Sequence, residues 1–156
     1  MRNKMPAGFS LIELVIVVVI IAIIAAIAIP KMSRGAAGAN DSATSQDLST
    51  MRSALDLYAG EHNSTYPIAA NVLTQLTQFT DINGNVSSTK TSVFLYGPYL
   101  KSVPALPVGT NKGLNTITTT GPAGTGSFGW FYDGTTMWVN DPNTDVDVAG
   151  TAYNTY

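Results

Sequence analysis

Residues 9–30 read FSLIELVIVVVIIAIIAAIAIP, an apolar run in which only Ser10 and Glu13 are polar. At about 1.5 Å per residue, a helix over residues 9–29 spans roughly 30 Å, the thickness of the hydrocarbon core of a bilayer. In lipid, the main-chain polar groups of such a segment have no water to bond, so it has to be helical. We therefore predict a membrane-spanning helix over residues 9–29.

Glu13 is the unusual residue of this segment. A carboxylate near a membrane-spanning segment costs roughly 3 kcal/mol or more unless it is paired. Two explanations follow from the residues alone. Glu13 finds a positive partner, or its side chain merely reaches the membrane surface.

The apolar run allows three interpretations. It is a single-pass anchor, a secretory signal peptide that is cut after the A-x-A pattern at residues 26–28, or an anchor preceded by a short basic leader. The run is longer than the 7–15 apolar residues of a signal peptide, and it contains an acid. Basic residues stand on both sides, Arg2 and Lys4 before it and Lys31 and Arg34 after it, so the charges do not decide the topology.

The heptapeptide Gly8-Phe9-Ser10-Leu11-Ile12-Glu13-Leu14 resembles the class III signal of type IV pilins and of the pseudopilins of type II secretion. The resemblance implies that a prepilin peptidase cuts between Gly8 and Phe9 and methylates the new amino group of Phe9. It divides the chain into a leader at 1–8, a transmembrane and polymerisation helix at 9–29, and an exported domain at 30–156. It also assigns Pro30 to the position where these helices commonly carry a proline, which is expected to kink the helix.

Cleavage would supply the missing partner of Glu13, because it creates a cation at the amino group of Phe9. Glu13 of one subunit can then meet Phe9 of another and fix the axial register of a helical bundle. Glu13 can also pair with the amino group of its own chain, since the two residues are four apart. We expect Glu13→Ala to leave membrane insertion intact and to impair filament assembly.

The composition excludes several classes of function. The chain of 156 residues has no cysteine, one histidine (His62) and a formal net charge of −2, with 12% charged residues. A thiolate metal site, a histidine-rich site and a Ser-His-Asp triad are therefore improbable. The basic surface that nucleic acid requires is missing. We expect no enzyme and no nucleic-acid partner.

Beyond Pro30 the helical pattern continues. The side chains of Leu48, Met51, Leu55 and Tyr58 recur at helical spacing. This pattern predicts one long helix over residues 9–59, with a less stable region over residues 30–40. The helix is expected to end at residue 59, with Gly60 as its C-cap. The apolar stripe is expected to pack on a sheet.

The strongest strand signal is FGWFYDGTTMWV at residues 128–139. Asp133-Gly134 favours a hairpin turn between two aromatic runs. Strand alternation would give Phe128, Trp130 and Tyr132 a common face, directed at the helix. We therefore predict an α+β fold, in which the second half of a long N-terminal helix packs on a small antiparallel sheet. Weaker signals indicate a short helix or loop over residues 72–79, a turn at residues 83–84, a strand or helical turn at 92–96 and a strand over 116–120.

Two further segments resemble major pseudopilins. Residues 55–67, LDLYAGEHNSTYP, are similar to the end of their helix, and residues 99–109, YLKSVPALPVG, to their Y-L-x-x-x-P-x-D-P-W-G loop. The chain departs from that loop at Leu106 and Val108, where the aspartate and the tryptophan would stand.

An acidic segment near the C-terminus spaces oxygen ligands at every second residue: Asp141, Asn143, Asp145 and Asp147. Calcium loops use this spacing, and major pseudopilins often bind calcium in such a loop. However, Val146 stands where an EF-hand loop has glycine. Calcium is the only cofactor that the sequence indicates, and the alternative is a solvated acidic loop.

The leading hypothesis is a structural subunit of a helical filament of identical copies. Its partners would be a prepilin peptidase, an assembly platform of the bacterial inner membrane and, before assembly, membrane lipid. The protein would leave the inner membrane for a filament in the periplasm or on the cell surface. The alternative is a single-pass periplasmic binding module, for carbohydrate or another surface ligand, that uses the aromatic hairpin.

Overall fold

The computed structural model describes residues 8–120, 126–142 and 144–156, and only the main chain of residues 29–34. The leader residues 1–7 lie outside this range. The chain forms two compact units, one up to Ala36 and one from Ala37 to Tyr156. This division does not test the predicted boundary between the membrane helix, residues 9–29, and the exported domain, residues 30–156.

A single helix, α1, runs from Leu11 to Glu61 through both units. It begins after Ser10, whose main-chain N–H donates to Glu13 Oε2 at 2.8 Å. This is one half of a capping box, in which a glutamate three residues into the helix satisfies an N–H group that the helix cannot. The main chain stays helical through residues 30–40. The predicted long helix is therefore confirmed, and its kink at Pro30 stays a prediction.

The expected C-cap at Gly60 is wrong, because α1 continues to Glu61. The left-handed residues are instead Asn63, with φ 53°, and Ser64, with φ 62°. The Ser64 N–H reaches back to the carbonyl oxygen of Ala59 at 2.8 Å, which satisfies a group at the helix end. Asparagine is among the residues that tolerate this conformation, so glycine is not needed here.

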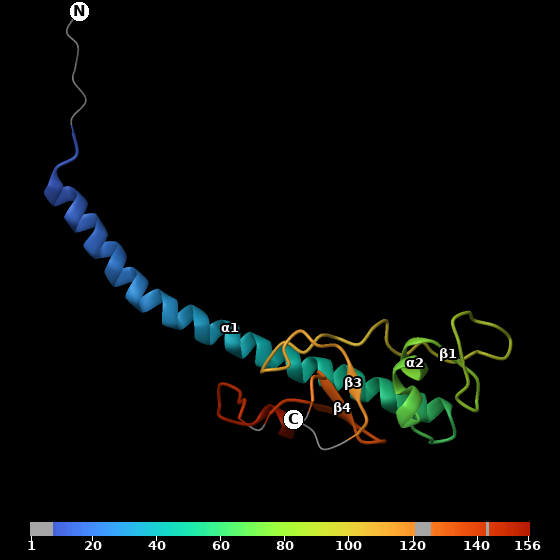
Figure 1. Cartoon of the computed structure of the whole chain (residues 1–156). Coiled ribbons are helices and arrows are strands. Elements are labelled where there is room, and N and C mark those ends of the chain that lie inside the picture. Colours follow the sequence, from blue (N-terminus) through green and yellow to red (C-terminus); the bar gives the residue numbers. More distant parts are fainter. Residues whose placement is uncertain (1–7, 121–125, 143) are drawn as a thin grey trace, which may run out of the picture. The chain divides into compact units, whose positions relative to one another are not determined.

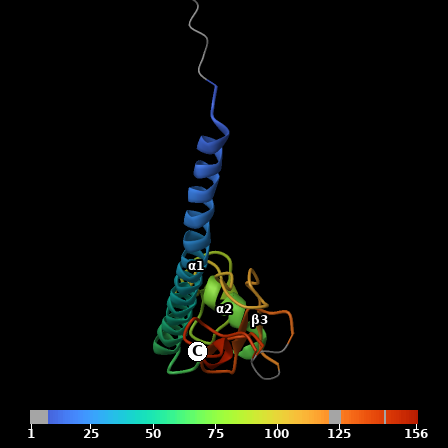
Figure 2. The ribbon, with the colours of Figure 1, turned by 90° about the vertical axis from the view of Figure 1, so that its left-hand side faces the viewer.

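The core of the second unit forms on the apolar stripe of α1. Leu48, Met51, Leu55 and Tyr58 are all at most 2% exposed. They share one buried cluster with residues of the aromatic hairpin. Figures 1 and 2 show the strands and the short helix α2 (Val72–Thr77) lying beside this part of α1. The predicted packing of the stripe on a sheet is confirmed.

The described residues form five short strands in two sheets. They are β1 (Phe79–Thr80), β2 (Val86–Ser87), β3 (Ile117–Thr118), β4 (Trp130–Tyr132) and β5 (Met137–Val139). The first two form an antiparallel pair, and the others form a sheet of order β3-β4-β5. β4 and β5 are antiparallel, whereas β3 and β4 are parallel. The α+β class is confirmed, with a mixed sheet in addition to an antiparallel one.

The parallel pair could not be expected from hydrophobic alternation, which carries no information on strand direction. Parallel neighbours need a connection longer than a hairpin turn, and residues 119–129 provide it. Two 3₁₀ turns, at Ala69–Asn71 and Tyr153–Thr155, complete the elements. The segment at residues 92–96 forms neither strand nor helix and contributes a single bridge, from Tyr96 to Thr80.

The hairpin at Asp133-Gly134 exists, but its loop has four residues, because Tyr132 pairs with Met137. Asp133 Oδ1 accepts hydrogen bonds from the main-chain N–H groups of Thr135 and Thr136, both at 2.8 Å. Trp130 and Tyr132 are fully buried, as the alternation predicts. Phe128 lies before β4 and is 38% exposed, so its predicted place on the same buried face is wrong.

Candidate functional site

The N-terminal site is built from Gly8, Phe9 and the first turn of α1. Gly8 and Phe9 precede the helix, and Phe9 is 82% exposed. The Gly8–Phe9 bond, where the sequence predicts cleavage, therefore lies in a non-helical segment. Glu13 lies one turn away, bonded to the main chain of Ser10. The pattern Ser10-x-x-Glu13 is a sequence signature for this cap, so the geometry could have been found from the sequence.

The helix that follows is apolar on every side. Among the described residues, one helix is long and apolar enough to cross a membrane, with its window at Leu11–Ala28. Its large side chains are between 43% and 81% exposed. A surface of this kind is unstable in water and has to be covered by lipid or by other apolar helices.

The acidic segment brings together two of its four predicted ligands. Asp141 Oδ1 accepts from the main-chain N–H of Asn111 at 3.0 Å, and Asp145 Oδ2 accepts from that of Thr110 at 2.5 Å. Asp141 is fully buried, and its Oδ2 has no hydrogen-bond partner among the described residues. Burial raises the pKa of Asp141 to about 6, and the adjacent charge of Asp145 adds to the rise. Hydrogen bonds from Thr110 lower the pKa of Asp145.

Gly109 makes this arrangement possible. Its φ is +69°, which L side chains rarely adopt, and a Cβ at this position would overlap the carboxylate of Asp141. The loop at Gly109-Thr110 thus closes over the two carboxylates. A buried carboxylate oxygen without a partner, beside a second carboxylate, is a place that suits a positive ion.

The other two predicted ligands do not join this pair. Asn143 lies outside the described residues. Asp147 accepts from the Tyr156 hydroxyl at 2.6 Å and from main-chain N–H groups of the turn at residues 148–151. In the part of the chain that the structure describes, no three His, Cys, Asp or Glu side chains converge as a metal site would require. Of the predicted ligands that the structure describes, Asp141 and Asp145 therefore lie together and Asp147 does not join them.

The acidic segment is tied to α1 by residues that the sequence analysis missed. The buried carboxylate of Asp41 accepts from the Tyr153 hydroxyl at 2.5 Å and from the Val148 N–H at 3.0 Å. Arg52 donates to the main-chain oxygens of Met137, at 2.9 Å, and Tyr156, at 2.8 Å. Asp41 and Arg52 are charged residues of the helical segment whose apolar side chains form the core. Because a buried charge needs partners, their positions were the sequence signal for these contacts.

His62 is a structural residue rather than a catalytic one. It is 3% exposed, and its ring stacks on Tyr58 with centroids 3.8 Å apart. Nδ1 lies 2.8 Å from the Tyr58 carbonyl oxygen and Nε2 lies 2.9 Å from that of Asp81. Both ring nitrogens are therefore occupied by main-chain oxygens, and the ring joins the end of α1 to the β1–β2 turn.

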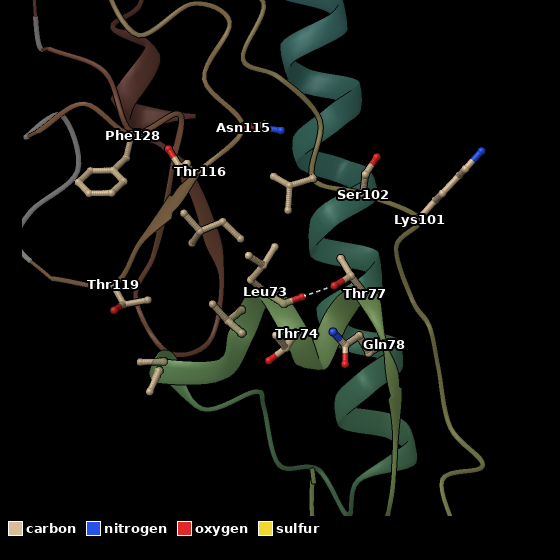
Figure 3. Close-up of a pocket in the computed structure, with 15 residues that line it drawn as sticks. Leu73, Thr74, Thr77, Gln78, Lys101, Ser102, Asn115, Thr116, Thr119 and Phe128 are labelled. Atoms are coloured by element: carbon tan, nitrogen blue, oxygen red, sulfur yellow. Dashed lines mark hydrogen bonds between the residues drawn. The ribbon is translucent and has the colours of Figure 1, made fainter. Parts of the chain in front are cut away.

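A groove of about 740 Å³ lies between α2 and the segment around β3. Figure 3 shows Leu73, Thr74 and Thr77 of α2 at this groove, with Thr116 beside β3 and Phe128 in the segment before β4. The only ionisable residue among the described ones that line it is Lys101. Its described lining otherwise offers hydroxyl, amide and apolar groups.

Comparison with known proteins gives one result for the N-terminal site. The sequence model of the prokaryotic N-terminal methylation motif matches residues 3–29. The match covers residues 3–8, the Gly8–Phe9 bond and the apolar segment up to residue 29, so the resemblance seen in the sequence is confirmed for this part of the chain. No curated protein and no solved structure matches the chain.

Proposed function

We propose, from the prokaryotic N-terminal methylation motif that the chain carries, that this protein is a structural subunit of a type IV pilus-like or type II secretion pseudopilus filament. The motif is the class III signal of type IV pilins and pseudopilins, and it supports processing by a prepilin peptidase. The observation that carries the proposal is the exposed apolar helix at Leu11–Ala28 with a carboxylate in its first turn.

The mechanism is assembly rather than catalysis. Before assembly, lipid covers the apolar side chains of Leu11–Ala28. In the filament, the same surface is covered by the helices of neighbouring copies. Because lipid tails are as apolar as these side chains, the exchange has a small net cost, and close packing between helices can drive it.

Glu13 gives the helices a register. In the uncut chain, its carboxylate caps the Ser10 N–H at 2.8 Å. Cleavage between Gly8 and Phe9 leaves a charged amino group near this turn. We propose that Glu13 then pairs with the amino group of Phe9 on a neighbouring copy, since an unpaired carboxylate among apolar helices is costly.

Two substitutions separate this role from simple capping. Glu13→Gln keeps an oxygen that can cap the helix but removes the charge, whereas Glu13→Ala removes both. We expect both variants to enter the membrane and to yield few filaments, as seen by electron microscopy of sheared material. Normal filament yield from Glu13→Gln would reject the charge pairing.

Deletion of the prepilin peptidase tests the function itself. We expect cells without it to retain residues 1–8 and to form no filament. The proposed location is the bacterial inner membrane with the C-terminal unit exported, followed by a periplasmic or surface filament built on an inner-membrane platform. An uncut chain in wild-type cells would instead favour a plain anchor.

We further propose that Asp141 and Asp145 hold a calcium ion. The support is the buried, unpartnered Oδ2 of Asp141 beside a second carboxylate. The ion would supply positive charge and fix the loop that Asp41 and Arg52 tie to α1. A thermal melt of the full chain in detergent should show a higher midpoint with calcium than with chelator, and Asp141→Asn should abolish the difference. Equal midpoints for the wild-type chain would discard the site.

For the alternative function, a membrane-tethered carbohydrate-binding module, Trp130 and Tyr132 of the aromatic hairpin are not accessible to a ligand, because they are buried. The groove beside α2 is the surface that favours it (Figure 3). Titration with neutral and acidic oligosaccharides tests this alternative. Saturable binding in isothermal titration calorimetry that is lost in Leu73→Arg would support the alternative. Heats no larger than those of dilution would reject it.

A further inference from the structure

The turn that follows α1 reads Glu61-His62-Asn63-Ser64-Thr65, in which Asn63-Ser64-Thr65 is an N-x-T acceptor sequence for N-linked glycan. We propose that Asn63 carries an N-linked oligosaccharide. The inference rests on the proposed function in one respect, because it requires that this unit be exported.

The chemistry is a group transfer without oxidation or reduction. The donor class is an oligosaccharide bound through pyrophosphate to a polyprenol lipid. A bond forms between Nδ2 of Asn63 and the anomeric carbon of the first sugar, while the bond from that carbon to the pyrophosphate oxygen breaks. The lipid pyrophosphate leaves, and the amide nitrogen gives up one proton.

The structure presents this asparagine to solvent. α1 ends at Glu61, and Asn63, Ser64 and Thr65 are all exposed. The φ of Asn63 is 53°, so the chain reverses at this residue. Within the described part of the chain, the side chains of Asn63 and Thr65 make no hydrogen bond, so both the acceptor amide and the hydroxyl of the acceptor sequence are available.

The turn beneath is fixed by other groups, so a glycan on Asn63 would not disturb it. The Thr65 N–H donates to the carbonyl oxygen of His62 at 3.0 Å, and the buried His62 ring lies against the main chain of Tyr58 and Asp81. A hollow of about 260 Å³ borders Asn63 and leaves room for the first sugar ring.

A second N-x-S sequence, Asn85-Val86-Ser87, provides an internal comparison. Here Nδ2 of Asn85 donates to Asp81 Oδ2 at 2.8 Å, and the Ser87 hydroxyl donates to the Thr89 carbonyl oxygen at 2.9 Å. Both groups that the transfer needs are therefore engaged. The structure thus favours Asn63 over Asn85 as the acceptor.

The test is mass spectrometry of the full chain purified from membranes or filaments of its own cells. Cleavage before aspartate separates the acceptor sequence at Asn63 from the one at Asn85, because Asn63 falls in the peptide at residues 56–80 and Asn85 in the peptide at 81–132. We expect glycan mass on the first peptide and none on the second. The start of the chain, read in the same digest, reports on the proposed function independently.

Four variants sharpen the result. Asn63→Gln and Thr65→Ala should each abolish the glycan, Thr65→Ser should retain it, and Asn85→Gln should leave its level unchanged. A chain that starts at Phe9 and carries an unmodified peptide at 56–80 would overturn the inference and leave the filament proposal standing. A glycan that persists in Asn63→Gln would also overturn it, whereas a chain that retains residues 1–8 would count against the proposed function.

Discussion

The hydrogen bond between Tyr153 and Asp41 should be one of the strongest single contacts that hold the C-terminal segment on α1. The hydroxyl lies 2.5 Å from Asp41 Oδ1, and the two residues are 7% and 8% exposed. Burial and the bond to Asp41 raise the pKa of the Tyr153 hydroxyl, so it stays protonated and can donate. Hydrogen bonds to charged groups contribute about 1.5–3 kcal/mol when they are buried.

Tyr153→Phe removes only this hydroxyl. The ring and its edge contact with Tyr156 can remain, and the Val148 N–H still donates to the other oxygen of Asp41 at 3.0 Å. We therefore expect the free energy of unfolding of the second unit to fall by about 2 kcal/mol, toward the middle of that range. With a urea dependence of about 2 kcal/mol/M, the unfolding midpoint should fall by about 1 M.

The assay is urea unfolding of the full chain in detergent micelles, followed by tryptophan fluorescence. Tyr66→Phe is the matched control, because the Tyr66 hydroxyl also donates to an aspartate, Asp56 at 3.1 Å, but in an exposed position. We expect that control to lose much less stability than Tyr153→Phe, because the Tyr66 hydroxyl is bonded in an exposed position. Equal losses from Tyr153→Phe and Tyr66→Phe would refute the reasoning that burial makes the Asp41 contact strong.

Three further predictions concern the core and the acidic loop. Leu55→Ala should lower the free energy of unfolding by about 2–5 kcal/mol, whereas Leu57→Ala, at a site 55% exposed, should change it little in the same urea titration. In chelator, the raised pKa of Asp141 should cost the wild-type chain stability as pH rises from about 4 to about 6, so Asp141→Asn should gain stability relative to wild type across that window and no further above it. Thermal melts at a series of pH values check this, and a gain that does not change with pH would contradict it. Gly109→Ala should lower the melting midpoint at every pH, because its φ of +69° disfavours a side chain and the Cβ would overlap the Asp141 carboxylate.

The features with strong periodic or compositional signals could be predicted from the sequence. Helical spacing of apolar residues predicts the long helix and its buried stripe at Leu48 and Leu55. Two aromatic runs on either side of a turn signal predict the hairpin. The α+β class followed from the order of these elements. The N-terminal motif was specific because glycine, an aromatic residue and an acid stand at fixed spacing before an apolar run.

What could not be predicted depends on contacts between distant residues. The parallel pairing of β3 with β4 leaves no trace in local hydrophobicity. The surroundings of Asp147 could not be predicted either, because alternate spacing of acids does not reveal that its carboxylate accepts a hydrogen bond from the Tyr156 hydroxyl. Gly60 was assigned as the cap because glycine favours left-handed conformations, yet the chain uses Asn63 and Ser64 two residues after the helix ends.

The central claim is that residues 1–8 are a leader and that Phe9 begins the working protein. Mass spectrometry of the N-terminal peptide, from wild-type cells and from cells without prepilin peptidase, tests this directly. The account predicts a wild-type chain that starts at Phe9 and carries one methyl group on its amino nitrogen, and a chain that retains Gly8 and the residues before it when the peptidase is missing. A wild-type chain that starts after residue 28, as a secretory signal peptide would leave it, or one that keeps its leader in both strains, would contradict the account.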